Sequence, residues 1–178
     1  IMKKRFKIYL FRHGQTTFNR DGRFTGWMDS KLTEQGKRHA LGIARQLKDK
    51  RIDVAIHTRL SRSKDTLAPV LKGHPECRIV LEDDRMIERN YGRLNRLMHW
   101  GVVRKFGTRK YDEWHRSWNI KPPKGESFAD VEVRVKDFIK DLKKFVRKNK
   151  VNVAISAHGN SIRLFRKVIE GASKKEAI

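Results

Sequence analysis

The sequence predicts an α/β protein, a three-layer α/β/α sandwich around a mostly parallel sheet. The first observation is a set of four short apolar runs, nearly continuous as in strands buried on both faces, at residues 7–11, 53–57, 78–81 and 151–157. The second is that helical patterns separate these runs. Strands that alternate with helices are typical of a parallel sheet covered on both sides.

Two helices can be placed from their capping residues and apolar stripes. Thr33 precedes one helix, with Glu34 in its first turn and an apolar stripe at Ala40, Ile43, Ala44 and Leu47. Ser127 precedes a second helix, with Asp130 three positions on. The apolar residues of this helix alternate at steps of three and four: Phe128, Val131, Val135, Phe138, Leu142 and Phe145. Its other face we interpret as a solvated surface of Lys136, Lys140, Lys143, Lys144 and Lys148.

A length of 178 residues is that of one ordinary domain, so we expect a single domain over residues 1–178. A Lys-Pro-Pro-Lys-Gly loop at 121–125 separates the long second helix from a small helical insert after the third strand, about residues 93–120. The single cysteine, Cys77, excludes an internal disulfide framework. No apolar run approaches a membrane span and the start lacks the apolar region of a signal peptide, so we expect a cytoplasmic protein without membrane contact.

The charge of the chain is strongly positive. Forty-three Lys and Arg residues against twenty Asp and Glu residues give a formal net charge of +23. Such a charge favours anionic partners, which include phosphorylated metabolites, nucleic acid and acidic membranes. The basic residues are spread from end to end, and no RNA-binding signature, zinc knuckle or helix-turn-helix pattern occurs. We therefore favour a surface charge that reflects the composition of the host or a hot or saline habitat over dedicated nucleic-acid binding, which stays open as a polyanion-binding alternative. The partner we expect is a small phosphorylated substrate.

Histidines and arginines follow three of the predicted strands. Arg12 and His13 close the first strand, Arg62 comes shortly after the second, and His158 closes the last. Ligands bind just beyond the carboxyl edge of such a sheet. A neutral imidazole can attack phosphorus while cationic neighbours offset the charge on the phosphoryl oxygens. The pattern therefore predicts a phosphoryl-transfer enzyme, and we expect no metal because neither histidine has clustered carboxylates beside it.

Phosphoryl transfer also requires a proton donor for the leaving oxygen. Glu88 is the candidate, because it lies in a mixed polar loop shortly after the third strand and close to Tyr91. A surface salt bridge is the alternative role for this side chain.

Five segments together resemble the histidine phosphatase superfamily, and within it the cofactor-dependent phosphoglycerate mutase branch. They are Leu-Phe-Arg-His-Gly-Gln-Thr at 10–16, Arg-Phe-Thr-Gly-Trp-Met-Asp at 23–29, Leu-Thr-Glu-Gln-Gly at 32–36, Ile-Glu-Arg-Asn-Tyr-Gly at 87–92 and Ala-His-Gly-Asn-Ser at 157–161. The resemblance runs in order over nearly the whole chain. Arg-Phe-Thr-Gly-Trp and Glu-Arg-x-Tyr-Gly are the parts most specific to the mutases.

The resemblance implies a phosphoglycerate mutase-like fold and an enzyme that interconverts 3-phosphoglycerate and 2-phosphoglycerate in glycolysis and gluconeogenesis. His13 would become the phosphohistidine, Glu88 would act as acid and base, and the phosphoryl group would be held by Arg12, Arg62 and His158. 2,3-Bisphosphoglycerate would prime the histidine, without a metal. The substrate would be contacted by Asn19, Thr25, Gly26, Arg89, Tyr91, Arg116, Gly159 and Asn160. A homodimer is the assembly we expect.

The chain departs from the mutase pattern at two positions and at its C-terminal end. His99 stands where the mutases usually carry a lysine, and His115 stands where they carry the first of two arginines. An imidazole with its ordinary pKa is largely neutral at pH 7. If both histidines act as substitute cations, affinity for phosphoglycerate increases as the pH falls from 8 toward 6. A C-terminal segment shorter than usual in the branch would admit water, which favours the alternative function, a phosphomonoester phosphatase.

Overall fold

The computed structural model describes residues 5–178. Residues 1–4, part of the chain start in which we expect no signal peptide, lie outside the described residues. Four parallel strands form one sheet in the order β1-β4-β2-β3. The strands are β1 (Ile8–Arg12), β2 (Val54–His57), β3 (Ile79–Glu82) and β4 (Val153–Ala157). Each begins and ends within two residues of the sequence prediction.

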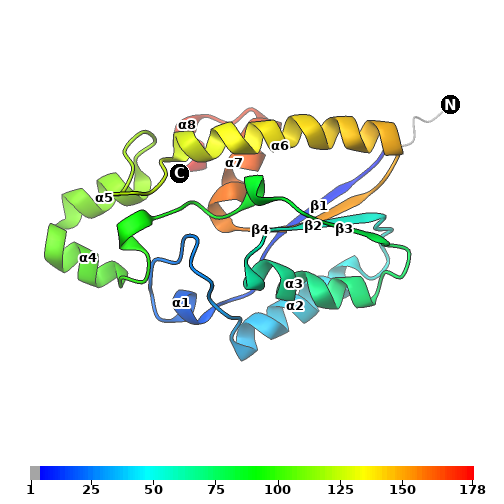
Figure 1. Cartoon of the computed structure of the whole chain (residues 1–178), viewed down its shortest axis with the longest axis horizontal. Helices are drawn as coiled ribbons and strands as arrows, with labels where there is room; N and C mark the ends of the chain where they lie inside the picture. The colour runs from blue at the N-terminus through cyan, green and yellow to red at the C-terminus, as the bar shows by residue number, and fades with distance from the viewer. Residues whose placement is uncertain (1–4) are drawn as a thin grey trace.

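Helices cover both faces of this sheet (Figure 1). Helices α2 (Glu34–Leu47) and α3 (Ser61–Lys72) lie on one face, and α6 (Phe128–Asn149) and α7 (Gly159–Glu170) lie on the other. Side chains alternate along each strand, so Val54 and Ile56 pack toward α6 and α7 while Ala55 packs toward α2 and α3. The predicted three-layer α/β/α architecture is confirmed.

The two helices predicted from capping residues begin where the sequence places them. The Thr33 hydroxyl accepts a hydrogen bond from the Gly36 amide at 3.0 Å. At the start of α6, the Ser127 hydroxyl accepts from the Asp130 amide at 3.1 Å, and the Asp130 carboxylate accepts from the Ser127 amide at 2.9 Å. These bonds satisfy amides that the first helical turn leaves unpaired. The five lysines predicted on the outer face of α6 are exposed.

Strand β3 is not buried on both faces, and that part of the prediction is wrong. All four of its residues are exposed, with Ile79 at 48%, Val80 at 44% and Leu81 at 42%. β3 is the last strand in the sheet, so one of its edges is unpaired in the described chain. A short apolar run indicates a strand, but it does not report whether that strand is central or terminal.

The remaining helices lie mostly beyond the carboxyl edge of the sheet. The predicted insert at about 93–120 contains α4 (His99–Phe106) and α5 (Thr108–Arg116), which project from one end of the molecule (Figure 1). Their core is a cluster of Phe24, Tyr91, Leu94, Val102 and Trp114. The short elements are α1 (Thr17–Arg20), α8 (Lys174–Ala177) and the 3-10 helices η1 (Asp84–Met86) and η2 (Gly92–Leu94). Within residues 5–178, no helix has the length and apolar character that crossing a membrane requires.

Candidate active site

The strand order brings the predicted site residues together. β4 lies between β1 and β2, so the residues that follow these strands, His13, Thr58 and His158, are neighbours at the carboxyl edge. The His13 amide donates to the Ala157 carbonyl at 3.1 Å. The centroids of the His13 and His158 rings are 5.1 Å apart. Two segments separated by almost the whole chain therefore form one site.

The imidazole of His13 is held in one tautomer. Its Nδ1 lies 2.7 Å from the Gly14 carbonyl oxygen, which can only accept, so Nδ1 carries the proton. Nε2 then keeps its lone pair, and it accepts from Arg62 Nε at 3.3 Å. Burial, and secondarily the charge of Arg62, lowers the pKa of His13 from 6.5 to about 3. The ring is therefore neutral at pH 7, with a nucleophilic nitrogen facing a guanidinium group.

Arg62 is fixed in place by the loop that precedes α2. Only 1% of Arg62 is exposed, and its guanidinium donates to the carbonyls of Met28 at 2.7 Å and Gly26 at 2.8 Å. Asp29 accepts from both the amide and the hydroxyl of Ser61, and so caps α3 just before Arg62. Burial lowers the pKa of Arg62 to about 10, which leaves it charged at pH 7.

His158 lies behind His13 and is fully buried. Its Nε2 is 2.7 Å from the Thr58 hydroxyl, and its Nδ1 has no hydrogen-bond partner among residues 5–178. Burial, followed by the charge of Arg62, holds the pKa of His158 well below 6.5. His158 is therefore a neutral side chain with one unused polar atom next to the nucleophile, and such an atom is unusual in a protein interior.

Glu88 points into the site and does not form the alternative surface salt bridge. It is 8% exposed, and no ion pair joins it to another described residue. Its Oε1 accepts from the amides of Arg89 at 2.9 Å and Asn160 at 3.0 Å. A Cβ placed on Gly159 would lie 3.7 Å from Glu88 Oε2 and 3.6 Å from Arg12 Cζ. The glycine therefore leaves room between this carboxylate and Arg12.

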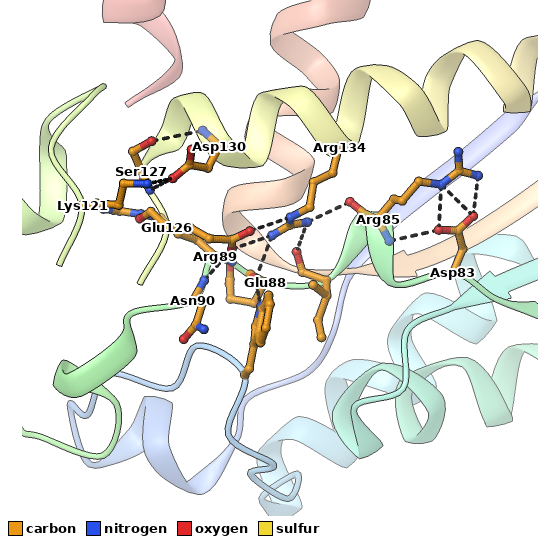
Figure 2. Close-up of polar contacts among 12 residues, drawn as sticks. Asp83, Arg85, Glu88, Arg89, Asn90, Lys121, Glu126, Ser127, Asp130 and Arg134 are labelled. Atoms are coloured by element: carbon orange, nitrogen blue, oxygen red, sulfur yellow. Dashed lines mark hydrogen bonds and ion pairs between the residues drawn. The ribbon is translucent and has the colours of Figure 1, made fainter. Parts of the chain in front are cut away.

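The loop that carries Glu88 is held from outside by α6 (Figure 2). Arg134 donates at 2.8 to 3.1 Å to the carbonyls of Arg85, Ile87 and Glu88. It also pairs with Glu126 at 3.0 Å. From the other side, the Trp27 indole donates to the Glu88 carbonyl at 2.7 Å. The sequence analysis did not identify Arg134 or Glu126, since neither stands in a strand-end motif.

A cavity of about 190 Å³ lies against His13 and is lined by most of the predicted residues. They are Arg12, His13, Asn19, Thr25, Gly26, Arg62, Glu88, Tyr91, His99, His115, Arg116, Gly159 and Asn160. His158 and Arg89 do not line it. Three residues that the sequence analysis did not assign do so: Arg23, Phe24 and Arg163.

Comparison with known proteins identifies the family. The model of the histidine phosphatase superfamily (branch 1) matches residues 8–177. The chain belongs to this superfamily. A protein of a Chelativorans species is 37% identical over 176 residues, which cover 96% of this chain and 84% of that protein. A protein of Bartonella henselae is 33% identical over 175 residues, with the same coverage. Both are named 2,3-bisphosphoglycerate-dependent phosphoglycerate mutase.

Solved structures of the histidine phosphatase superfamily share the fold. A putative alpha-ribazole-5'-P phosphatase of Escherichia coli has a TM-score of 0.84 at 23% identity, covering 97% of this chain and 84% of that one. A phosphoglycerate mutase of Bacillus anthracis has a TM-score of 0.78 at 23% identity, covering 95% and 82%. Enzymes named for both reactions therefore share this architecture, and the fold alone does not separate them.

One predicted substrate contact of this superfamily member lies away from the cavity. Arg89 is fully buried, and its guanidinium donates to the carbonyls of Trp114 at 2.6 Å, Glu126 at 2.7 Å and His115 at 3.2 Å. These bonds tie the Glu88 loop to the end of α5. Three of the five N–H donors of Arg89 are thus used by backbone carbonyls, and its role in substrate binding stays a prediction.

His99 and His115, which we expected to act as cations between pH 8 and 6, lie among aromatic rings in the cavity wall. The His99 ring lies 3.9 Å from the Phe24 ring, and its Nδ1 is 2.9 Å from the Tyr111 hydroxyl. Burial, with a smaller effect of Arg116, lowers the pKa of both histidines, that of His115 to about 4. His115 is therefore neutral in that range in the free protein, and burial opposes the protonation of His99.

All three missed cavity residues had a signal in the sequence. Arg23 and Phe24 belong to the Arg-Phe-Thr-Gly-Trp segment, and Arg163 follows Asn160 by three residues on α7, hence on the same helix face. A search of that helix face would have found Arg163. As for metals, no group of three or more His, Cys, Asp or Glu side chains suited to an ion occurs within residues 5–178. That the enzyme works without a metal stays a prediction.

Proposed function

We propose that the protein is a 2,3-bisphosphoglycerate-dependent phosphoglycerate mutase that interconverts 3-phosphoglycerate and 2-phosphoglycerate in glycolysis and gluconeogenesis, in the cytoplasm. The observation that carries the proposal is the neutral His13 imidazole, with Nε2 at 3.3 Å from Arg62 in a basic cavity. The names of the relatives at 33% and 37% identity support the same reaction.

The residues of the site suit phosphoryl transfer through His13. Nε2 attacks phosphorus, so that an N–P bond forms and the P–O bond to the leaving oxygen breaks. Arg12 and Arg62 offset the charge on the phosphoryl oxygens, and His158, whose ring centroid lies 5.1 Å from that of His13, would help to hold the group. Glu88 gives a proton to the leaving oxygen and takes one back from the hydroxyl group that later accepts the phosphoryl group.

The cavity also fits the primer, 2,3-bisphosphoglycerate, which supplies the first phosphoryl group when bound. This molecule carries an anionic group at each end, and the cavity has arginines at both ends. Arg12 and Arg62 lie beside His13, at the inner end of the cavity. Arg116 and Arg163 lie near His115, at what we call the outer end. Guanidinium groups are well suited to phosphate and carboxylate.

The second candidate is a phosphomonoester phosphatase that uses the same residues. Water would then take the phosphoryl group from His13 before a phosphoglycerate could. The lowered pKa values of His99 and His115 favour this alternative, because they reduce the positive charge in the part of the site that would retain a doubly anionic acceptor.

One assay separates the two functions. The protein is incubated with 3-phosphoglycerate, with and without 2,3-bisphosphoglycerate, while 2-phosphoglycerate and free phosphate are both measured. We expect isomer formation that depends on the primer, with little phosphate released. Abundant release of phosphate from many esters, with no dependence on the primer, would contradict the mutase proposal and support the phosphatase.

The homodimer that we expect would use the exposed edge of β3. If two copies pair antiparallel with Val80 opposite Val80, Ile79 lies opposite Leu81 and Arg78 lies opposite Glu82 of the second copy. Apolar and opposite-charge pairs across strands stabilise such an edge. Analytical ultracentrifugation tests this: the native chain should sediment as a dimer and Val80→Lys as a monomer. A native monomer, or a dimer that Val80→Lys leaves intact, would contradict it.

A further inference from the structure

The outer part of the cavity contains two arginines without a partner in the described part of the chain. Arg116, at the end of α5, and Arg163, on α7, both line the cavity. No hydrogen bond or ion pair joins either guanidinium to another residue of 5–178. By contrast, Arg166, three residues after Arg163, pairs with Glu170 at 2.9 Å. The charge on Arg163 is therefore not used to stabilise its own helix.

The position of Arg163 on α7 directs it to the site. It follows Asn160 by three residues and shares its helix face, and Asn160 donates to the Tyr91 hydroxyl at 3.1 Å in the cavity wall. Side chains on a helix lean toward its N-terminus. For α7 that end lies at the carboxyl edge of the sheet, next to His158 and His13. This orientation directs the guanidinium of Arg163 toward the cavity.

The two histidines nearby do not supply this charge, whereas Arg23 adds a charge of its own, with one nitrogen bound to a backbone carbonyl. The pKa values of His99 and His115 are lowered, chiefly by burial, and Arg163 is one of the charges that lower the pKa of His115. One nitrogen of Arg23 donates to the Arg96 carbonyl at 2.9 Å. Glu88, the acidic residue of the cavity lining, is engaged at the inner end by two backbone amides. The outer end thus has positive charge without a counter-charge.

We infer that Arg163 is a specificity-determining residue that, with Arg116, binds the second anionic group of the substrate while the phosphoryl group to be transferred lies at His13. The inference rests on the proposed function. Two guanidinium groups in one concave site repel each other until an anion lies between them, so an uncompensated pair of this kind favours anion binding. The planar fork of a guanidinium matches a carboxylate or a phosphate.

The test compares two ligands in two variants. The substrate p-nitrophenyl phosphate has a single anionic group, and 3-phosphoglycerate has two. The inhibition constant of 3-phosphoglycerate against hydrolysis of p-nitrophenyl phosphate reports its affinity even if it is not isomerised. Arg163→Gln should raise this constant on the order of tenfold, as the loss of one charge-assisted hydrogen bond does. The kcat/KM for p-nitrophenyl phosphate should fall by no more than about threefold.

Arg166→Gln is the matched control, since it removes the same charge three residues further along α7 from a residue outside the cavity lining. It should leave both values within about twofold of the native protein. Arg163→Lys should recover part of the affinity, because it keeps the charge but loses the planar fork. An unchanged inhibition constant in Arg163→Gln, or an equal loss for both ligands, would overturn the inference.

The outcomes also separate this inference from the proposed function. If 3-phosphoglycerate competes, and competes less well in Arg163→Gln, but is never isomerised, the mutase proposal fails and the role of Arg163 stands. If 3-phosphoglycerate is isomerised with the same KM in both proteins, the mutase proposal stands and Arg163 does not determine specificity.

Discussion

The inner and outer ends of the cavity differ in how their charged groups are held. At the inner end, Arg62 donates to two carbonyls of the loop that precedes α2, and Glu88 accepts from the amides of Arg89 and of Asn160 on α7. At the outer end, Arg116 and Arg163 have no such bonds to described residues, and burial lowers the pKa values of His99 and His115. The inner end, where bonds form and break, is therefore preorganised. The outer end, which selects the substrate, keeps its charged groups free to bind the substrate.

Burial of the groups at the inner end has an energetic cost and a catalytic benefit. Burial of His13, His158 and Arg62 removes titratable groups from water, which disfavours their charged forms. The benefit is that the nucleophile needs no deprotonation at neutral pH. Substitutions at the inner end should therefore affect the chemical step on every phosphate ester, whereas those at the outer end should depend on the ligand.

The largest expected effect is that of His13→Ala. Removal of the nucleophile should lower kcat by about 10³-fold or more on both 3-phosphoglycerate and p-nitrophenyl phosphate, since both reactions pass through Nε2. Steady-state kinetics measures this loss. His39→Ala, which removes an exposed histidine on α2, is the control and should keep most of the activity. Retained turnover in His13→Ala would break the assignment of the inner end.

Next is Glu88→Gln, which should distinguish leaving groups. Loss of a general acid costs about 10²- to 10⁴-fold where the leaving oxygen needs a proton. The alkoxide of a phosphoglycerate needs one, whereas p-nitrophenolate leaves without it. We therefore expect a much larger fall in kcat for the alkyl phosphate, with phosphohistidine still formed from the aryl phosphate. Equal losses on both esters would argue against an acid role.

Arg134→Gln should give a smaller effect with the same selectivity, because Arg134 acts by positioning the Glu88 loop. It removes donors to three carbonyls and leaves Glu126 without its partner. We expect a loss of about 2 kcal/mol in the free energy of unfolding and a fall in kcat that is larger for the alkyl phosphate. Denaturant unfolding and kinetics measure these changes. Arg147→Gln, an exposed arginine on the same helix, is the control. A stability loss with equal kinetic loss on both esters would reduce Arg134 to a structural role.

The last prediction is a dependence of stability on pH. Burial lowers the pKa of His13 from 6.5 to about 3 and that of His115 to about 4, so between these values and 6.5 the unfolded chain binds more protons than the folded one. Stability should be fully present above pH 6.5 and fall as the pH falls, by up to about 1.4 kcal/mol per pH unit for each such group. Thermal unfolding at pH 7.5 and pH 5 tests this. A melting temperature that rises on acidification would contradict the neutral histidines.

The inner end could be predicted from the sequence better than the outer end. His13 and His158 each follow a strand, and a parallel sheet places strand ends at one edge, so local patterns are enough to bring them together. The burial that lowers the pKa values of His99 and His115 depends in part on Phe24, which comes from a separate segment. The position of Arg89 next to Glu88 in the sequence likewise does not reveal that it donates hydrogen bonds to two carbonyls of α5. Exposure of β3 likewise depends on strand order.

Direct detection of the phosphoryl group on His13 tests the central claim most closely. The protein is mixed with 2,3-bisphosphoglycerate carrying labelled phosphate, quenched in base within one turnover, digested and analysed by mass spectrometry. The account predicts one acid-labile phosphate on His13, formed at least as fast as turnover and discharged when 3-phosphoglycerate is added. Absence of label during turnover, or label on another residue with His13 unmodified, would contradict it.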